Sequence, residues 1–315
     1  MTSSGQILEQ IVDNVSKCIL GKKNEIELII TAMLAEGHVL LEDVPGTGKT
    51  VLIKALSKSI QGQFNRIQCN PDLLPSDVTG VSIYHPKTES FVFKVGPVMA
   101  NILLVDEINR ATTKTQSALL EAMEERQVSV DGECHPLPNP FLMLATQNSV
   151  DFEGTYMLPE AQLDRFMFKL SLGYPDEDTE LRMVQSQKKG HPLDELQPVT
   201  DMDTILQIQK QVYDVHIDEA VVEYGVQITR ATRTHPSVRL GASPRATLSL
   251  IHASKAFAIL QGRSYVIPDD LKQLAPSVLA HRLILQPESL YNGISQGSII
   301  QSVMDQVRAP VRMER

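Results

Sequence analysis

The chain has 315 residues, of which 42% are hydrophobic and 21% charged, and it has no tryptophan. This length suggests two domains, and the apolar content argues against disorder. With 29 basic and 38 acidic residues the formal net charge is −9, which disfavours a surface built to coat nucleic acid. A local basic groove, or one site for an anionic metabolite, remains compatible with this balance.

The amino-terminal residues carry no targeting signal that we recognise. Residues 1–10 are polar and include Glu9 where a signal peptide has its apolar stretch. No run reaches the roughly 18 uninterrupted apolar residues of a membrane span. Cys18, Cys69 and Cys134 are widely spaced without a C-x-x-C pair, which argues against a disulfide framework or a zinc site. We therefore expect a soluble, cytoplasmic protein that does not insert into membranes.

The first half of the chain alternates predicted helices with short apolar strands. Apolar residues recur at helical spacing from Ile7 to Ala35 with a break at Gly21, which predicts two helices. Further helices are expected at 50–60 and 115–125, and buried strands at 38–42, 101–106 and 140–146. Apolar strands separated by helices are typical of a parallel sheet covered on both faces.

Two hairpins are predicted within this half. Residues 81–84 and 91–95 flank a turn-like segment, and 127–130 precede Asp131-Gly132, a strong hairpin signal. On pattern alone, two ordinary surface hairpins are an equally good interpretation.

The sequence pattern changes after Pro175. A polar stretch is followed only by segments whose apolar residues recur at helical spacing. Residues 246–260 carry an apolar stripe at helical spacing, and a further helix begins near Pro268, where proline and acids suit a helix start. We expect three parts: an α/β core at 1–175, a linker at 176–200 and a helical domain at 201–315.

A phosphate-binding loop is the most specific motif. Residues 45–50, with the sequence PGTGKT, lie between an apolar strand and a helix. Glycines let backbone amides approach a phosphate, a helix N-terminus favours an anion, and Lys49 suits the β and γ phosphate oxygens. The hydroxyl of Thr50 suits Mg²⁺. Asp43 stands where the strict motif has its first glycine, and the alternative, an incidental glycine-rich turn, is disfavoured by the flanking strand and helix.

A second motif, LLVDE at 103–107, ends a predicted buried strand in two acids. The carboxyl edge of a parallel sheet is where such folds bind ligands. Asp106 suits the Mg²⁺ shell and Glu107 suits a general base that polarises water. Solvated acids at a strand end are the alternative. GTPases usually lack the second acid and no N-K-x-D signature is present, so ATP is favoured.

Three polar residues are further candidates. Asn148 follows the third predicted strand and suits the orientation of a water molecule, with a loop cap as the alternative. Arg165 alone is more typical of a surface charge. Ser243 and Pro244 resemble an N-cap and first helical residue, so Arg245 lies in a first turn, where a bound phosphate would offset its conflict with the helix dipole. A solvated arginine with a packed stem is the alternative.

Together these segments resemble the MoxR family of AAA+ ATPases, in the clade with a helix-2 insert. The resemblance covers nearly the whole chain, and Asp43 is a familiar departure in that family. It is carried by residues 37–50, 70–80, 105–110, 116–126, 158–166 and 280–283. It implies an α/β fold: a P-loop NTPase αβα sandwich with a parallel sheet, followed by an all-α lid domain.

The resemblance also implies residue roles. Asn148 corresponds to sensor 1, Arg245 to sensor 2, and Arg165 to an arginine finger offered to the ATP of a neighbouring subunit. The implied catalytic set is Lys49, Glu107, Asn148, Arg165 and Arg245. The implied ATP contacts are Ile19, Gly21, Pro45, Gly46, Thr47, Gly48, Lys49, Thr50, Val51, Asp106 and Arg245, with Mg²⁺ held by Thr50 and Asp106. The two hairpins become the helix-2 insert and the pre-sensor-1 hairpin, facing the pore or a partner.

The function implied is Mg²⁺-dependent ATP hydrolysis between core and lid in a homo-oligomeric ring, expected to be a hexamer. Such a ring would remodel or mature a client protein complex, or insert a metal into it, with a partner that has a von Willebrand factor A domain. One alternative is a nucleic-acid or chelatase motor of the same clade, which net acidity disfavours for DNA. Another is a nucleotide-gated binding switch with slow hydrolysis.

Overall fold

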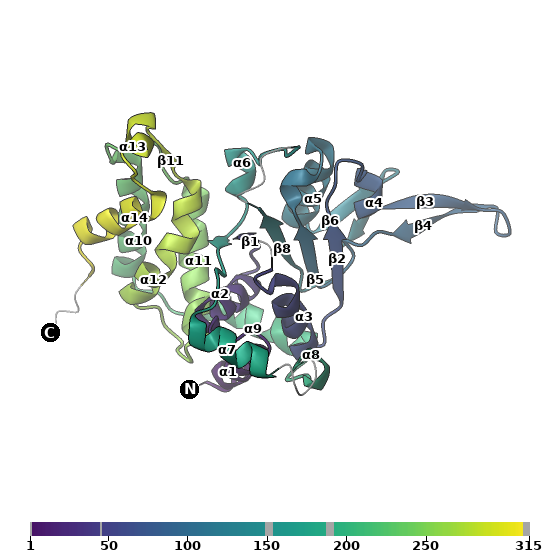
Figure 1. The fold of residues 1–315 in the computed structure, drawn as a ribbon, viewed down its shortest axis with the longest axis horizontal. Coiled ribbons are helices and arrows are strands. Elements are labelled where there is room, and N and C mark those ends of the chain that lie inside the picture. Colours follow the sequence, from purple (N-terminus) through teal and green to yellow (C-terminus); the bar gives the residue numbers. More distant parts are fainter. Residues whose placement is uncertain (1, 45, 149–153, 187–191, 311–315) are drawn as a thin grey trace.

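A five-stranded parallel sheet forms the centre of the computed structural model, which describes residues 2–44, 46–148, 154–186 and 192–310. The strand order is β2-β5-β8-β1-β9 (Figure 1). The strands are β1 Val39–Glu42, β2 Phe64–Gln68, β5 Ile102–Asp106, β8 Leu142–Gln147 and β9 Phe168–Leu170. Neighbours in the sheet are not neighbours in the chain, so helices connect them across its faces.

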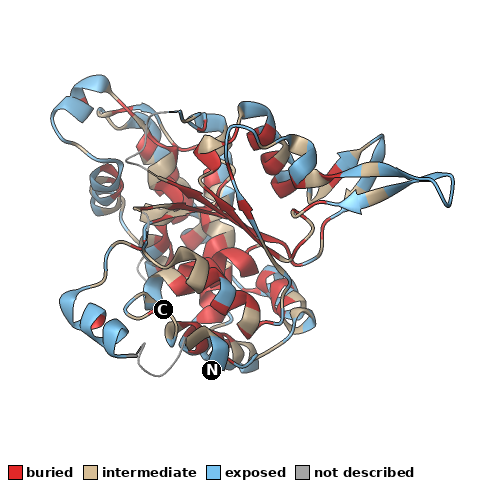
Figure 2. Ribbon diagram, turned by 45° about the vertical axis from the view of Figure 1, so that its right-hand side comes forward, coloured by how far each residue is buried: buried red, intermediate tan, exposed pale blue. Residues whose placement is uncertain are grey.

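Apolar side chains leave the central strands toward both faces. In β5, Ile102 and Leu104 belong to one buried cluster, whereas Leu103 and Val105 belong to another. Helices cover each face: α1 Ser3–Ser16, α2 Lys23–Leu34 and α3 Lys49–Ser59 on the first, and α5 Thr113–Glu125 on the second. Figure 2 shows the sheet as a buried layer between helices. The predicted α/β fold with a buried parallel sheet is confirmed.

The two edge strands, β2 and β9, were not predicted. Only Ile67 of the five β2 residues is buried, and β9 has three residues. The three central strands could be predicted because both of their faces are apolar, which gives a continuous apolar run in the sequence. The edge strands are shorter or more polar and give no such run. The edge strand β2 matters for the site, because two of its polar side chains reach the sheet's carboxyl edge.

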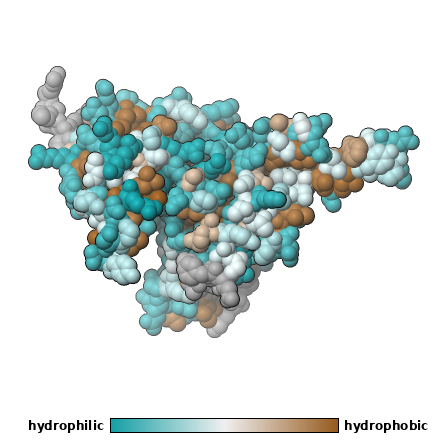
Figure 3. All heavy atoms as spheres, turned by 90° about the horizontal axis from the view of Figure 1, so that it is seen from above, coloured by the Kyte–Doolittle hydropathy of each residue, from teal (hydrophilic) through white to brown (hydrophobic). Residues whose placement is uncertain are grey.

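Both predicted hairpins are present. Strand β3 Gly80–His85 pairs with β4 Ser90–Val95, and β6 Gln127–Val130 pairs with β7 Glu133–Pro136. Figure 1 shows the β3–β4 hairpin as an arm that projects away from the sheet, and Figure 3 shows hydrophobic residues along it. The exposed apolar residues of the arm are Val81, Ile83, Tyr84, Phe91, Val92 and Val95.

Short helical turns link these elements, and longer helices make up the carboxy-terminal part. The connecting helices are α4 Pro75–Thr79, η1 Ile108–Arg110, α6 Glu160–Leu163 and, inside the expected linker, the ten-residue α7 Glu177–Ser186 and α8 Pro192–Glu195. The lid helices are α9 Met202–Asp214, α10 Glu219–Thr234, α11 Pro244–Leu260, α12 Pro268–Leu279, η3 Ala280–Arg282, α13 Pro287–Tyr291 and α14 Gln296–Gln306. A small antiparallel pair, β10 Val238–Leu240 with β11 Ile284–Leu285, interrupts the expected run of helices.

The lid helices pack against the amino-terminal helices. Helix α11 contacts α1 and α2, and its buried residues belong to the same apolar cluster as theirs. The predicted start of α11 is correct: Ser243 is the N-cap and accepts a hydrogen bond from the Ala246 N–H at 3.3 Å, and Pro244 is the first helical residue. The domain limits at 175 and 201 stay a prediction. Within the described residues, no helix has the length and apolar content needed to cross a membrane.

A buried histidine, His38, lies just before β1 and hydrogen-bonds to residues of α5 and β8. Its Nε2–H donates to the Met123 carbonyl at 3.1 Å, and its Nδ1 accepts from the Met143 N–H at 3.0 Å. Burial lowers the pKa of His38 to about 3. Both ring nitrogens therefore have roles that only the neutral ring can fill, because a protonated Nδ1 would face another N–H donor.

This arrangement predicts a pH-dependent loss of stability. The unfolded state binds a proton near the ordinary histidine pKa of about 6.5 and the folded state does not, so stability falls as pH falls below that value. His38→Gln offers the same donor and acceptor without titrating. The slope of the unfolding free energy against pH should be smaller in this variant than in wild type, by about 1 kcal/mol per pH unit between about pH 6 and 5. Urea unfolding across this range measures the slope, with the exposed His85→Gln as control. Equal slopes in His38→Gln and wild type would contradict it.

Candidate active site

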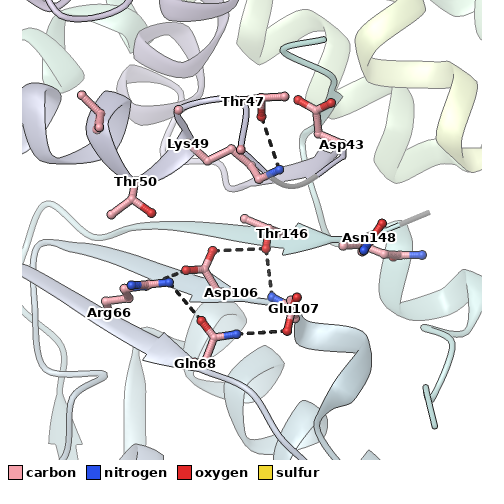
Figure 4. A pocket seen from close by; sticks show the side chains of 14 residues that line it. Asp43, Thr47, Lys49, Thr50, Arg66, Gln68, Asp106, Glu107, Thr146 and Asn148 are labelled. Carbon is pink, nitrogen blue, oxygen red and sulfur yellow. Dashed lines mark hydrogen bonds and ion pairs between the residues drawn. The ribbon is translucent and has the colours of Figure 1, made fainter. Parts of the chain in front are cut away.

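One cavity lies at the carboxyl edge of the sheet, where β1, β5 and β8 end (Figure 4). The P-loop forms one side and the strand ends form the other. Its lining residues are Asp43, Gly46, Thr47, Gly48, Lys49, Thr50, Val51, Arg66, Gln68, Asp106, Glu107, Thr146, Gln147 and Asn148. The fold thus gathers the described residues of both predicted motifs, together with Asn148. Pro45, a predicted ATP contact, lies outside the described residues.

The P-loop backbone has the shape that brings amides toward a ligand. Gly46 and Gly48 have φ angles of +87° and +88°, in the left-handed region that favours glycine. Gly48 is the N-cap of α3, which begins at Lys49, so the helix N-terminus opens on the cavity. Ile19 lies directly behind this turn: its Cδ1 is 3.2 Å from the place a Cβ would occupy on Gly48. This geometry suits phosphate binding.

The Lys49 side chain is folded back onto its own loop. Its Nζ donates to the Val44 carbonyl at 2.8 Å and lies 3.4 Å from the Thr47 hydroxyl. Burial lowers the pKa of Lys49, opposed by the negative charges of Asp43, Asp106 and Glu107. The ammonium therefore has a carbonyl partner that a phosphate oxygen can replace with a stronger, charged one.

Asp43, the departure from the strict motif, has a structural role. It is buried, and its Oδ1 accepts from the Val44 N–H at 2.9 Å. Its Oδ2 accepts from the Leu172 and Gly173 N–H groups at 3.0 and 3.1 Å. One carboxylate therefore fastens the start of the P-loop to the chain that follows β9, which a glycine cannot do.

Asp106 and Glu107 lie at the end of β5, held by a network across the strand ends. Asp106 Oδ1 accepts from the Thr146 hydroxyl at 3.2 Å, and its Oδ2 pairs with Arg66 Nε at 2.6 Å. The Glu107 N–H donates to the Thr146 oxygen at 2.9 Å, and Glu107 Oε2 accepts from Gln68 Nε2 at 3.0 Å (Figure 4). Glu107 has a φ of +55°, a conformation that costs a non-glycine residue about 1 to 3 kcal/mol. Such strain is found most often where function fixes a side chain.

Sequence reasoning missed Arg66 and Gln68. They are two residues apart on β2 and so leave the strand on the same side, where both reach the acids of β5. The available signal was their spacing around the apolar Ile67. It was not used because the β2 segment is too polar to stand out as a strand.

The other predicted residues fall into two groups. Ile19 and Gly21 are not among the described residues that line the cavity, although Ile19 lies against Gly48 and Gly21 lies against Thr179 of α7. Arg165 and Arg245 are not among them either. Both pair with Glu124: Arg165 Nη1 lies 3.0 Å from Oε2, and Arg245 Nη2 lies 2.5 Å from Oε1. The structure therefore brings the two arginines to each other and to a carboxylate, rather than to this subunit's P-loop.

Comparison with known proteins identifies the family. Residues 38–168 match the family model described as "ATPase family associated with various cellular activities (AAA)", and 230–303 match the AAA lid domain. The chain is 41% identical to Chaperone MoxR1 of Mycobacterium tuberculosis over 96% of this chain and 82% of that protein.

The chain belongs to the MoxR family of AAA ATPases.

Further relatives agree with this assignment. Uncharacterized protein YeaC of Bacillus subtilis is 51% identical over 97% of this chain and 96% of its own. The crystal structure of a proposed ATPase from Cytophaga hutchinsonii superposes with a TM-score of 0.92 at 39% identity, covering 98% and 96% of the two chains. The MoxR resemblance, the core-plus-lid fold and the ATPase class are confirmed, and an ATPase binds nucleotide.

The oxygen donors of this MoxR-family site fit a magnesium ion. Mg²⁺ usually takes only one or two protein ligands and completes its shell with water and phosphate oxygens. The Thr50 hydroxyl and the Asp106 carboxylate line the same cavity. Arg66 pairs with the Asp106 Oδ2 in this structure, so Arg66 and a divalent cation are alternative counter-charges for that oxygen. No cluster of three or more His, Cys, Asp or Glu that would hold a metal occurs in the described chain, as expected if phosphates supply the remaining ligands.

The Asp43 contacts predict a clear effect on stability. Asp43→Ala leaves three N–H groups without their acceptor, so the free energy of unfolding should fall by about 2 to 3 kcal/mol. Asp43→Asn keeps an acceptor oxygen and should lose less, whereas Asp43→Gly, which restores the strict P-loop motif, should lose at least as much as Asp43→Ala. Urea unfolding without nucleotide measures all three. An Asp43→Gly protein as stable as wild type would contradict the role of this carboxylate.

Proposed function

We propose that this AAA ATPase hydrolyses ATP with Mg²⁺ in a homo-oligomeric ring, and that hydrolysis drives chaperone-like remodelling of a client protein complex. The observation that carries the proposal is the convergence of Lys49, Glu107 and Asn148 on one cavity opened by a P-loop and a helix N-terminus. A cation, a fixed carboxylate and a neutral amide all suit hydrolysis of a γ-phosphate, and the proposal adds an arginine from a neighbouring subunit.

In this proposal, Glu107 polarises the attacking water and Asn148 orients it without titrating. Glu107 accepts a hydrogen bond from Gln68 and lies 3.3 Å from Arg110 Nε. These partners hold the carboxylate away from the role of a base until a bound nucleotide reorganises the cavity. Lys49 exchanges the Val44 carbonyl for the β and γ phosphate oxygens.

Thr50 and Asp106 are the residues that would hold Mg²⁺. When bound, the ion would supply positive charge that offsets the negative charge on the transferred phosphoryl group. Asp106 would act in the ion's shell, usually through a water, and its Oδ2 is paired with Arg66.

Arg165 and Arg245 act, in our proposal, at the cavity of a neighbouring subunit. For Arg165 this is the role that the family resemblance implied, an arginine finger offered to the ATP of a neighbour. For Arg245 it revises the expectation of a contact with ATP bound to its own subunit, because Arg245 pairs with Glu124 beside Arg165 and is not among the described residues lining the cavity. A cavity completed from outside requires an oligomer, and we propose the hexameric ring usual for AAA ATPases.

The chaperone role rests on relatives and on exposed surface. Similarity to a protein named Chaperone MoxR1 supports it. The β3–β4 arm, whose Phe91 is 74% exposed, offers apolar surface for a client. A partner with a von Willebrand factor A domain, and maturation or metal insertion in the client, remain part of the proposal.

The role of Glu107 predicts a separation of binding from hydrolysis. Glu107→Gln keeps the size and the hydrogen-bonding capacity of the side chain but cannot act as a base, so kcat should fall by about 100-fold or more. ATP affinity should change little, because Lys49 and the loop backbone remain. Steady-state ATPase assays and nucleotide titration measure the two, with the exposed Glu121→Gln as control. Turnover unchanged in Glu107→Gln would remove the general-base role.

Action across subunits predicts rescue on mixing. Arg165→Ala keeps an intact cavity but offers no finger, whereas Lys49→Ala offers the finger but cannot use ATP. Each variant alone should be nearly inactive, and mixed rings should regain ATPase activity where an intact cavity faces an intact arginine. Activity is measured across mixing ratios. Failure to rescue at every ratio would contradict an arginine supplied by a neighbour.

A further inference from the structure

Two arginines from different parts of the fold share one carboxylate. Glu124 is near the end of α5, Arg165 follows α6, and Arg245 is in the first turn of lid helix α11. Arg165 bonds one Glu124 oxygen and Arg245 bonds the other. The Glu124 side chain is 31% exposed, and those of the arginines are 33% and 49% exposed, so the group lies at the surface and is open on one side.

The residues beside the two arginines are fixed as well. The Ser243 hydroxyl donates to Asp164 Oδ2 at 3.1 Å, which ties the start of α11 to the residue before Arg165. Arg282 of η3, with a 2% exposed side chain, lies 3.1 Å from Asp164 Oδ1 and donates to the Asp164 carbonyl at 3.0 Å. Backbone positions at 164 and 243 are therefore set by Asp164, whereas the guanidinium tips of Arg165 and Arg245 meet at Glu124.

The charges explain why a carboxylate is needed there. Two guanidiniums at one spot repel each other, and Arg245 also acts on the buried Arg282: burial and the Arg245 charge lower the Arg282 pKa to about 10, against the opposing charge of Asp164. Glu124 takes one guanidinium nitrogen from each arginine, and a guanidinium has five N–H donors, so several donors of each remain for another ligand. The two arginines and Glu124 together carry one net positive charge, and Glu121 and Glu125 line the same surface pocket as Glu124 and Arg165.

We propose that Glu124 is a positioning residue that holds Arg165 and Arg245 together as a double-arginine unit, which meets the triphosphate bound by a second copy of this chain. The inference rests on the proposed function, in which both arginines act on a neighbour. Glu124 itself does not touch the nucleotide. It sets the distance between two cations so that both reach the phosphates in one encounter, without the cost of ordering each arginine separately.

The first test separates this role from nucleotide binding. Glu124→Ala should lower kcat by about 10- to 100-fold through misplacement of the arginines. Affinity for a fluorescent ADP analogue should stay within about twofold, because Glu124 is not among the described residues that line the cavity. Glu124→Asp keeps the charge and should recover part of the loss, and the exposed neighbour Glu125→Ala should behave as wild type. A rise in kcat would overturn the proposal, because Glu124 would then restrain the arginines rather than present them.

The deciding test is made in mixed rings with Arg165→Ala subunits, which have an intact cavity. A Lys49→Ala donor should rescue ATPase activity, a Lys49→Ala/Glu125→Ala donor should rescue equally, and a Lys49→Ala/Glu124→Ala donor should rescue at least about 10-fold less. Full rescue by the Glu124→Ala donor overturns the role of Glu124 alone. Failure of the Lys49→Ala donor itself overturns action across subunits, and the role of Glu124 with it.

A structural defect would give a different pattern. Because Glu124→Ala leaves two arginines without their shared partner, the donor's urea midpoint and ring assembly are measured alongside. The donor carrying Glu124→Gln keeps the side-chain shape but loses the charge, so it should assemble normally and still rescue less than the Glu125→Ala donor. Normal assembly with full rescue by the Glu124→Gln donor would overturn the proposal.

Discussion

Burial of the parallel sheet on both faces is the constraint on which the rest of the molecule depends. Apolar side chains of β5 and β8 leave toward opposite helical layers, so these strands have no polar surface except at their ends. Because parallel strands all end at the same edge, the acids after β5 and the amide after β8 meet the P-loop after β1 there. The catalytic groups are thus placed by the packing of residues that take no part in the chemistry.

The charged groups of the site each have a partner within the chain. Lys49 bonds the Val44 carbonyl, Asp106 pairs with Arg66, and Glu107 accepts from Gln68. Two of these contacts are hydrogen bonds and one is an ion pair, and each can be exchanged for a contact with phosphate or metal. In this acidic chain, Lys49 and Arg66 thus have partners inside the site rather than carboxylates elsewhere on the surface. Both side chains remain available to a ligand.

The sequence made some of these features predictable and hid others for physical reasons. The central strands and the P-loop carry strong local signals, continuous apolar runs and glycines flanking Lys49, and both were predicted. Strand β2 is an edge strand in which Ile67 is buried and Phe64 only partly buried, with polar residues between them, so Arg66 and Gln68 were missed with it. The place of Arg245 depends on how α11 packs against α1 and α2, which is a long-range property that no local pattern contains. The start of the helix that carries Arg245 was predictable, but the pairing of Arg245 with Glu124 was not.

The shared carboxylate also links chemistry to the position of the lid. Arg165 belongs to the sheet-bearing part of the chain and Arg245 to a lid helix, yet both tips meet at Glu124. A rotation of the lid against the core would separate Arg245 from Glu124 and would also break the contacts of Ser243 and Arg282 with Asp164, the residue before Arg165. If both arginines complete a neighbour's site, such a rotation in one subunit changes hydrolysis in the next. In a ring built from this chain, the two arginines proposed to complete a neighbour's site would then also depend on how the lid packs on the core.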